Sequence, residues 1–283
     1  KDGKYREALE LIKKDNPFPA ICGRVCNKRC EAACTRGTVD EAVAIDSIKR
    51  FIAEQDLHAE TRFIPEVVIP SNMGPWQEKI AIIGAGPAGL SCAYYLATRG
   101  YKPTVFDKNA RPGGMLTYGI PSYKLEKDVI EAEIDILREL GVDIRCGVEV
   151  GKDITIAKLR EEGYQAFYIA IGCQGGKLPG IPGEDAKGTS IAVKFLHDAT
   201  ENQDQKMSGD AIVVGGGNVA IDCARTAVRF GASKVSMYCL ESLETMPASK
   251  EEIDEALEEG ISINNSWGPK EVVQDDAGAV KAI

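Results

Sequence analysis

The segment IAIIGAGPAGL, residues 80–90, decides the fold of this 283-residue chain. Four apolar residues, typical of a buried parallel strand, lead into a Gly-x-Gly-x-x-Gly turn, and a segment with helical spacing follows up to Gly100. Glycines at these places permit a tight turn and let backbone N–H groups approach a pyrophosphate at the N-terminal end of a helix. The segment therefore predicts a dinucleotide-binding βαβ unit. Its expected contacts are Gly84, Gly86, Pro87, Ala88 and Gly89.

A second segment of this kind, AIVVGGGNVAID, lies about 130 residues further on, at 211–222. Here Ala220 replaces the third glycine, a variant that the dinucleotide fold accepts. The predicted helix 218–230 is closed by Gly231, a typical C-terminal cap. Two such turns imply two dinucleotides, and two neighbouring dinucleotides imply hydride transfer between them. The expected contacts of the second turn are Gly215, Gly217, Asn218, Val219 and Ala220.

Residues after the first turn indicate FAD as its ligand. The predicted strand 103–106 ends in Asp107, 23 positions after Gly84, where an acid accepts hydrogen bonds from ribose hydroxyls. A second glycine turn, RPGGML at 111–116, follows closely. A nicotinamide domain does not require this turn, whereas flavin domains use one to bring backbone close to the phosphates; the alternative is an ordinary turn. Further expected flavin contacts are Asp107, Lys108, Gly114, Met115 and Leu116.

The residues after the strand 234–238 favour NADH over NADPH at the second site. A 2′-phosphate calls for arginine or lysine as a charge-assisted donor. No basic residue stands between Lys234 and Lys250, and Glu241 would repel a phosphate. The alternative is that Glu241 is only a solvated loop acid. We therefore expect NAD(P)H at this site, with NADH favoured and with Glu241 as a ribose contact.

Composition excludes several classes of protein. The net charge of −9 and the isoelectric point near 5.0 give no basic surface for nucleic acid. No apolar stretch approaches the roughly 20 residues that span a membrane. Five of the nine cysteines stand singly in predicted helices or strands, as is usual for reduced cysteines in a cytoplasmic protein. We therefore expect a cytoplasmic location. The five cysteines are Cys92, Cys146, Cys173, Cys223 and Cys239.

Four other cysteines recur at every fourth residue near the N-terminus, which indicates a metal or cluster site. Structural zinc sites usually pair close cysteines across a loop, whereas iron–sulfur clusters more often use tight runs of cysteine, so zinc is the competing interpretation. On one continuous helix the first and last of them would lie about 18 Å apart, too far to bind one cluster. We therefore expect a broken segment, or two clusters with ligands from elsewhere. The candidate ligands are Cys22, Cys26, Cys30 and Cys34, with Arg24, Lys28 and Arg29 beside the anionic cluster.

These motifs together resemble the small (β) subunit of glutamate synthase. The resemblance rests on NPFP at 16–19, CGRVC at 22–26, GGMLTYGIP at 113–121 and the second glycine turn, and it covers nearly the whole chain. The relatives include the large subunit of NADH-dependent ferredoxin:NADP oxidoreductase and the N-terminal half of dihydropyrimidine dehydrogenase. The resemblance implies a helical domain with two [4Fe–4S] clusters and an FAD domain with an inserted nicotinamide domain. It also implies that electrons leave the flavin through the clusters to a partner subunit or domain.

The resemblance also implies residue roles. It matches Cys26, Cys30 and Cys34 to cluster ligands, Cys22 to a position that is not always a ligand, and Gly172 to the strand that returns near the flavin. NADPH-using members carry two arginines where this chain has Cys239 and Leu240. An upstream cysteine group and the last part of the FAD domain are also missing, so we expect a chain truncated at both ends.

The predicted architecture is therefore α/β, with an α-helical iron–sulfur domain and linker at 1–75, the first part of an FAD domain at 76–182 and an incomplete NAD(P) domain at 183–283. Helices are expected at 4–14, from a cap at Asp40 to about His58, at 128–140 and at 251–259. No side-chain acid or base is expected in catalysis, because hydride transfer depends on stacking the nicotinamide on the flavin. The expected function is an NAD(P)H-dependent electron-input enzyme. The alternative is a nucleotide-binding regulatory or assembly module that transfers nothing.

Overall fold

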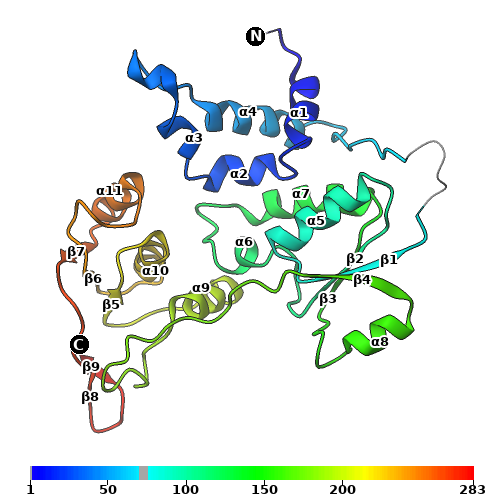
Figure 1. Cartoon of the computed structure of the whole chain (residues 1–283). Coiled ribbons are helices and arrows are strands. Elements are labelled where there is room, and N and C mark those ends of the chain that lie inside the picture. Colours follow the sequence, from blue (N-terminus) through cyan, green and yellow to red (C-terminus); the bar gives the residue numbers. More distant parts are fainter. Residues whose placement is uncertain (1, 70–75) are drawn as a thin grey trace. The chain divides into compact units, whose positions relative to one another are not determined.

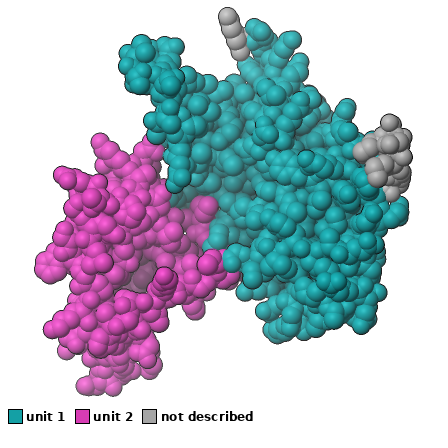
Figure 2. All heavy atoms as spheres, viewed as in Figure 1, with its two compact units in different colours: residues 1–117, 122–172 teal, residues 118–121, 173–283 magenta. Residues whose placement is uncertain are grey.

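The computed structural model describes residues 2–69 and 76–283 and divides into two compact units (Figure 2). Unit 1 comprises the residues up to 117 and residues 122–172, and unit 2 comprises residues 118–121 and 173–283. Both contain a parallel sheet with helices, so the predicted α/β class with two dinucleotide-binding folds is confirmed. The bounds of the three predicted domains stay predictions.

Unit 1 is built around a four-stranded parallel sheet of order β3-β2-β1-β4 (Figure 1). The two central strands are almost entirely buried, because β-branched and aromatic residues fill both of their faces. Helices α5 and α7 pack against each other, and α5 also packs on β1 and β2. The strands are β1 (Lys79–Ile83), β2 (Thr104–Asp107), β3 (Asp143–Cys146) and β4 (Tyr164–Ile169). The helices of this part are α5 (Pro87–Ala97), α6 (Met115–Tyr118), α7 (Lys127–Glu139) and α8 (Ile156–Glu161).

Glycine ends three of the predicted helices where the sequence places it. Gly100, Gly141 and Gly231 have φ angles of +88°, +86° and +88°, in the left-handed region that favours glycine. After each glycine, the N–H of the next residue donates to a carbonyl in the last turn of the helix, as in the bond from the Val142 N–H to the Leu137 oxygen at 3.0 Å. The helices predicted at 90–99, 128–140 and 218–230 are confirmed within a few residues at each end.

The N-terminal part of unit 1 consists of short helices, and the cysteine-bearing segment is broken, as one of the two alternatives expected. Helix α2 ends at Val25, and Lys28 then adopts a left-handed φ of +51° before α3 begins. The four cysteines therefore do not share a helix. The elements are α1 (Tyr5–Lys13), α2 (Pro19–Val25), α3 (Arg29–Ala32), the 3-10 helix η1 (Thr35–Thr38) and α4 (Ile45–Leu57).

The predicted cap at Asp40 is wrong. Helix α4 begins at Ile45, its N-cap is Ala44, and no side chain caps it. The carboxylate of Asp40 instead forms an ion pair with Arg36, with the Nε–Oδ1 distance at 2.9 Å, and accepts the N–H of Glu41. The carboxylate of Asp40 is therefore paired with a nearby arginine and a local backbone N–H, and it does not cap helix α4.

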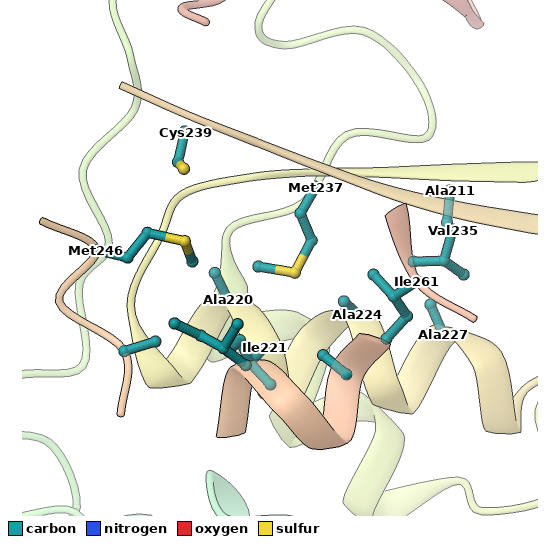
Figure 3. Packing of buried hydrophobic residues seen from close by; sticks show 13 residues of the cluster. Ala211, Ala220, Ile221, Ala224, Ala227, Val235, Met237, Cys239, Met246 and Ile261 are labelled. Atoms are coloured by element: carbon teal, nitrogen blue, oxygen red, sulfur yellow. The ribbon is translucent and has the colours of Figure 1, made fainter. Parts of the chain in front are cut away.

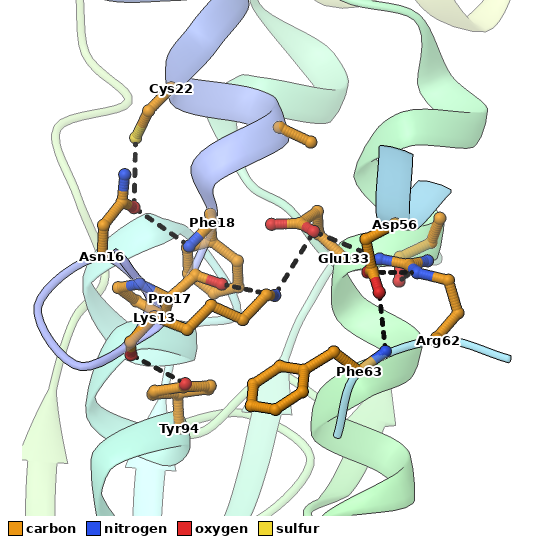
Figure 4. Close-up of polar contacts among 12 residues, drawn as sticks. Lys13, Asn16, Pro17, Phe18, Cys22, Asp56, Arg62, Phe63, Tyr94 and Glu133 are labelled. Atoms are coloured by element: carbon orange, nitrogen blue, oxygen red, sulfur yellow. Dashed lines mark hydrogen bonds and ion pairs between the residues drawn. The ribbon is translucent and has the colours of Figure 1, made fainter. Parts of the chain in front are cut away.

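A buried polar network joins the N-terminal helices to α7 within unit 1 (Figure 4). The Lys13 ammonium lies 3.5 Å from Glu133 Oε1 and donates to the Pro17 carbonyl oxygen at 3.3 Å. Arg62 reaches the same carboxylate at 3.3 Å and pairs with Asp56 at 2.7 Å. Burial raises the pKa of Glu133, with Lys13 and Arg62 opposing the shift. Glu133 is only 1% exposed, so the network depends on these cations.

Unit 2 is a second, smaller parallel sheet of order β5-β6-β7. Small residues of α10 pack against the middle strand, and Met237, fully buried on β6, lies at the centre of the cluster (Figure 3). The strands are β5 (Asp210–Val214), β6 (Lys234–Cys239) and β7 (Ser262–Asn265), followed by the antiparallel pair β8 (Val273–Gln274) and β9 (Val280–Ala282). The helices are α9 (Ala192–Glu201), α10 (Asn218–Arg229) and α11 (Lys250–Glu258).

Two further observations complete the fold. Part of the predicted proline-punctuated linker, residues 70–75, lies outside the described residues. Among the residues that the structure describes, no helix combines the length and apolar character needed to cross a membrane.

Candidate dinucleotide sites

The first glycine turn is dictated by close packing of backbone. Gly84 has a φ of +110°, and a Cβ there would lie 2.2 Å from the carbonyl oxygen of Ala170. A Cβ on Gly89 would lie 1.9 Å from the oxygen of Gly84, because the helix begins directly against the turn. Neither position accepts a side chain. The turn thus presents the start of α5, whose first N–H groups have no partner within the helix, as an anion-binding end.

The glycine turn at 111–116 of unit 1 lies against the glycine turn at 84–89, as the flavin interpretation requires. The N–H of Gly113 donates to the carbonyl of Ala85 at 2.7 Å. A Cβ on Gly114 would lie 2.8 Å from the Cα of Gly86. Two segments of bare backbone, about thirty residues apart in the chain, therefore meet without intervening side chains. Such a surface fits the phosphates of a dinucleotide, and Met115 and Leu116 continue from it into α6.

Asp107 lies at the end of β2, at the same edge of the sheet as the turn. Its side chain is buried at 8% exposure and accepts two backbone hydrogen bonds. Oδ2 accepts the N–H of Ala85 at 2.7 Å, and Oδ1 accepts the N–H of Asn109 at 2.8 Å. The carboxylate therefore fixes the turn. Since each of its oxygens has a second lone pair, it can still accept a ribose hydroxyl, and that role stays a prediction, as does the contact from Lys108.

A cavity of about 470 Å³ in unit 1 brings together basic residues that the sequence did not reveal as a group. Arg111, Lys127 and Arg138 line it, and Cys146, which pairs with Asp107 across β2 and β3, lies at its wall. Burial, followed by the charge of Arg111, lowers the pKa of Lys127 to about 8. Its ammonium donates to the carbonyl of Leu116 at 3.1 Å. These cations come from a loop and two turns of α7, so only the tertiary fold collects them.

The strand predicted to return near the flavin is β4, whose end lies at the glycine turn of residues 84–89. Its last pairing joins Ile169 to Ile83, and the N–H of Ala170 donates to the Ile83 carbonyl at 2.8 Å. The backbone of residue 170 therefore lies against the first glycine turn. Gly172 follows with a φ of +68°, two residues beyond this contact.

The glycine turn at 215–220, in unit 2, repeats the arrangement of the turn at 84–89 with looser packing. Gly215 has a φ of +141°, and its N–H donates to the Tyr238 carbonyl at 2.8 Å. Gly217 is the N-cap of α10. The side chain of Asn218 accepts the N–H of Ser249 at 2.9 Å, which ties the loop after β6 to the turn. Val219 is half exposed and Ala220 is buried.

Glu241 lies over the second turn. A Cβ built on Gly216 would lie 3.1 Å from Glu241 Oε2, so the carboxylate is next to the turn backbone. The carbonyl oxygen of Glu241 accepts hydrogen bonds from the Ser266 N–H at 3.1 Å and from Asn265 Nδ2 at 3.2 Å. The end of β7 thus fixes the loop that carries this acid.

The structure does not bring the four N-terminal cysteines together. Among residues 2–69 and 76–283, no group of three or more cysteine, histidine or acidic side chains is arranged to bind a metal ion. Cys22 is half-buried, with its Sγ 3.5 Å from Asn16 Oδ1, and burial raises the pKa of its thiol. Cys30 is exposed. The described residues alone do not form a closed ligand set, and the ligand roles of the four cysteines stay predictions.

The basic residues expected near a cluster are partly used elsewhere. The Arg24 side chain is only 7% exposed and pairs with Glu126 at 2.6 Å and Glu54 at 3.3 Å. It therefore joins α2 to α4 and to the residue before α7. The histidines are not part of either glycine turn: His197 stacks on Tyr118 with ring centroids 4.9 Å apart, as a structural contact.

Comparison with known families agrees with this geometry. Residues 78–283 match the family model of the pyridine nucleotide-disulphide oxidoreductases. The chain belongs to this family. Residues 1–61 match the model described as dihydropyrimidine dehydrogenase domain II, 4Fe-4S cluster. Membership assigns FAD and NAD(P)H as cofactors, and the second match assigns a 4Fe-4S cluster to the N-terminal part.

Curated relatives bear out the predicted resemblance. The chain is 36% identical to the glutamate synthase [NADPH] small chain of Escherichia coli, over all of this chain and 61% of that protein. It is 40% identical to the NADP(+)-dependent formate dehydrogenase subunit beta of Moorella thermoacetica, over 97% of this chain and 41% of that protein. It is 37% identical to the NAD-dependent dihydropyrimidine dehydrogenase subunit PreT of Escherichia coli, over 94% and 63%. The chain spans about two fifths to three fifths of the length of these relatives.

Solved structures show the same fold. FprA of Mycobacterium tuberculosis in complex with NADPH superposes with a TM-score of 0.58 at 17% identity, over 74% of this chain and 67% of that one. Thioredoxin reductase of Lactococcus lactis gives a TM-score of 0.52 at 22% identity, over 72% and 69%. At these identities the likeness concerns the fold alone. No Cys-x-x-Cys motif occurs in this sequence, and disulfide chemistry of the thioredoxin reductase type needs two sulfurs within bonding reach.

Proposed function

We propose that the protein is a flavin-dependent electron-input enzyme. It takes a hydride from NAD(P)H, with NADH favoured, onto FAD, and the electrons pass on through [4Fe–4S] clusters to a partner subunit or domain. The observation that carries this proposal is the repeated arrangement of the two units. Each has a parallel sheet, a glycine turn at the start of a helix, and an acid after the next strand at the same edge.

In this proposal the residues of unit 1 bind FAD and those of unit 2 bind the nicotinamide dinucleotide. In unit 1 the backbone of Gly86 and Gly114 faces the flavin phosphates, and Asp107 fixes the turn and accepts a ribose hydroxyl. In unit 2 the turn from Gly215 to Ala220 binds the nicotinamide pyrophosphate. When bound, FAD accepts the hydride, and the chain's own residues orient the two ring systems rather than exchange protons.

The preference for NADH rests on the surroundings of Glu241. Its carboxylate lies beside the turn, and the segment 235–249 contains no lysine or arginine. A 2′-phosphate placed there would meet a like charge without a cationic partner. The relatives carry both NADPH and NAD in their names, so cofactor choice differs among proteins of this kind and must be measured.

The proposed partner rests on the names of the relatives, and the proposed location rests on the cysteines. Several relatives are named as small chains or beta subunits, so we propose that the electron acceptor is another subunit or domain. The nine cysteines are all free, as expected in a reducing compartment, and we propose the cytoplasm.

The alternative is a nucleotide-binding regulatory or assembly module that transfers nothing. An electron-input enzyme and such a module differ in whether NADH reduces a bound flavin.

The test uses the full-length protein purified without oxygen. We expect stoichiometric FAD, iron and acid-labile sulfide, together with rapid bleaching of the flavin absorbance when NADH is mixed in a stopped-flow instrument. Gly86→Val places a branched side chain against the phosphates and should abolish flavin binding while the fold persists. A folded Gly86→Val protein that keeps its FAD would contradict the assignment of the first turn. Flavin that NADH does not reduce would favour the regulatory module, and zinc without sulfide would support the zinc interpretation of the cysteines.

A further inference from the structure

Trp267 is an exposed tryptophan at the carboxyl edge of the unit 2 sheet. It follows β7 by two residues and is 64% exposed. Since the strands β5, β6 and β7 are parallel, the residues that follow them emerge at one edge. The glycine turn follows β5 and Glu241 follows β6, so Trp267 shares the edge where ligands bind in folds of this type. A large aromatic side chain exposed at that edge lies where a ligand could pack against it.

Hydrogen bonds hold the loop of Trp267 against the loop of Glu241. The N–H of Trp267 donates to the Cys239 carbonyl at 2.9 Å, and the N–H of Ser266 donates to the Glu241 carbonyl at 3.1 Å. Ser266 adopts a left-handed φ of +62°, uncommon for a residue other than glycine. This conformation and these bonds fix the direction of the backbone at Trp267. The indole is therefore presented by a braced loop, next to the acid assigned to the adenosine ribose.

Leu240 completes an apolar surface at this place. It is 74% exposed and lies between Cys239, which is buried, and Glu241. A Cβ on Gly268, the residue after Trp267, would lie 2.8 Å from Leu240 Cδ2, so the leucine side chain lies against the tryptophan loop. An exposed leucine and an exposed tryptophan thus flank the ribose-binding acid, from two different strands.

We propose that Trp267 and Leu240 form the subsite for the adenine ring of the nicotinamide dinucleotide. The adenine is attached to the same ribose that Glu241 contacts, so it must lie within a few ångströms of that acid. Its flat, apolar faces match an indole and a leucine, and base stacking on an aromatic side chain tolerates the absence of polar contacts. The bound base covers Trp267 and Leu240 and so accounts for their exposure in the protein alone.

This inference rests on the proposed function and names Trp267 as a specificity-determining residue. The experiment compares wild-type, Trp267→Ala and Trp267→Phe forms of the full-length protein. Trp76→Phe serves as the matched control, because Trp76 stacks on Tyr101 and belongs to unit 1, whereas the turn at 215–220 belongs to unit 2. Each protein is mixed with NADH and with reduced nicotinamide mononucleotide, which lacks the adenosine half. The Kd and the limiting rate of flavin reduction are taken from the concentration dependence.

For NADH, Trp267→Ala should raise the Kd about 5- to 150-fold, the range expected for loss of one base–aromatic stack, with an unchanged limiting rate. Trp267→Phe should recover most of the affinity, and the control should match the wild type. With reduced nicotinamide mononucleotide the wild type and Trp267→Ala should behave alike. Binding of ADP-ribose should quench the part of the tryptophan fluorescence that Trp267→Phe removes.

Four outcomes separate the possibilities. Equal NADH affinity in wild type and Trp267→Ala would overturn the adenine subsite and leave the proposed function intact. An equal loss with both nucleotides would also overturn it, because Trp267 would then act on something other than adenine. Flavin that no nucleotide reduces in the wild type would overturn the proposed function itself. Exposed Trp267 fluorescence that responds only to a partner protein would assign this surface to that partner instead.

Discussion

The two glycine turns carry almost the same motif, but the structure gives them different tolerances. In unit 1 the third glycine, Gly89, leaves no room for a side chain, since its Cβ would lie 1.9 Å from the Gly84 oxygen. In unit 2 the same place is taken by Ala220, and a Cβ on Gly215 would lie 3.3 Å from its methyl group. A third glycine therefore reports how closely helix and turn approach, and only the first turn requires it.

The acids that follow the turns differ in a parallel way. Asp107 is buried and accepts two backbone N–H groups, one of them in the turn itself. The Glu241 carboxylate is half-buried beside its turn, and the bonds that fix its loop go to its backbone carbonyl. The first acid thus stabilises the turn itself through its side chain, whereas the second acid is positioned by hydrogen bonds to its backbone carbonyl.

The largest expected effect on stability concerns the third glycine position of the motif, which is Gly89 in unit 1 and Ala220 in unit 2. Gly89→Ala should destabilise unit 1 by about 4 kcal/mol or more, because the clash is with backbone that cannot move aside. Ala220→Gly should cost only about 0.5–1 kcal/mol, the usual penalty for glycine in a helix. Thermal unfolding and FAD content of both variants check this. A Gly89→Ala protein with wild-type stability and flavin content would show that the turn relaxes.

The next prediction compares ion pairs in the two units. Lys13→Met leaves the buried Glu133 with Arg62 as its remaining cation, and should cost about 3 kcal/mol, since removing one partner of a buried pair strands a charge. Its cost should shrink at low pH, where Glu133 is neutral, because burial already raises the pKa of this carboxyl. Arg229→Met in unit 2 removes a half-exposed partner and should cost less than about 1 kcal/mol.

Urea unfolding at pH 7 and pH 4.5 measures both variants. The double variant Lys13→Met/Glu133→Leu is the control, because replacing a buried pair by apolar residues is often neutral. If the double variant is as unstable as Lys13→Met alone, the loss comes from packing rather than from the stranded carboxylate.

The next prediction concerns the choice between NADH and NADPH, which tests the role of the second acid, Glu241. Glu241 without a nearby base should disfavour NADPH by about 2–3 kcal/mol, which corresponds to roughly a 30- to 150-fold preference for NADH. Arginines at positions 239 and 240 together with Glu241→Ser should narrow or reverse this preference. Stopped-flow flavin reduction at equal concentrations of NADH and NADPH provides the measurement. Equal efficiency of the two nucleotides with the wild type would refute our interpretation of this loop.

The smallest effect concerns acid stability in unit 2. Hydrogen bonds from Arg229 and Arg225 lower the pKa of Glu259 to about 2, against partial burial, which acts in the opposite direction. A carboxyl with a lowered pKa contributes stability above its unfolded pKa near 4.5 and loses it as the pH falls toward 2. Glu259→Gln should therefore cost about 1 kcal/mol at pH 7, after allowance for solvent screening, and nothing at pH 2. A pH-independent difference between the two proteins would assign the loss to packing.

The elements with strong local signals could be predicted from the sequence. Apolar runs followed by glycine turns gave β1 and β5, and glycines in the left-handed region closed α5, α7 and α10. The predicted cap at Asp40 is wrong because its carboxylate pairs with Arg36, and only the folded side-chain geometry shows this pairing. Helices α8 and α9 carried no motif, and their short amphipathic patterns are weak without a partner surface.

The site was predictable where the backbone acts and not where distant residues meet. The contact of Gly86 with Gly114 follows from two visible turns. The cations Arg111, Lys127 and Arg138 meet only because the loop at 110–112, α7 and β3 line one cavity, and sequence spacing does not show that. Trp267 could not be predicted as a site residue for the same reason, because its exposure at a sheet edge is a property of the folded chain alone.

The short segment 118–121 has a consequence for how this protein can be divided. The backbone passes from unit 1 to unit 2 after residue 117, returns after 121 and passes over again after 172. Tyr118, stacked on His197 and 2% exposed, belongs to the core of a unit whose remaining residues begin at 173. No single protease cut releases unit 2 intact, and a chimera joined only at 172 would replace one ring of this stack with a foreign residue. Recombination can exchange unit 2 between relatives only when the four residues 118–121, which interrupt the sequence of unit 1, travel with it.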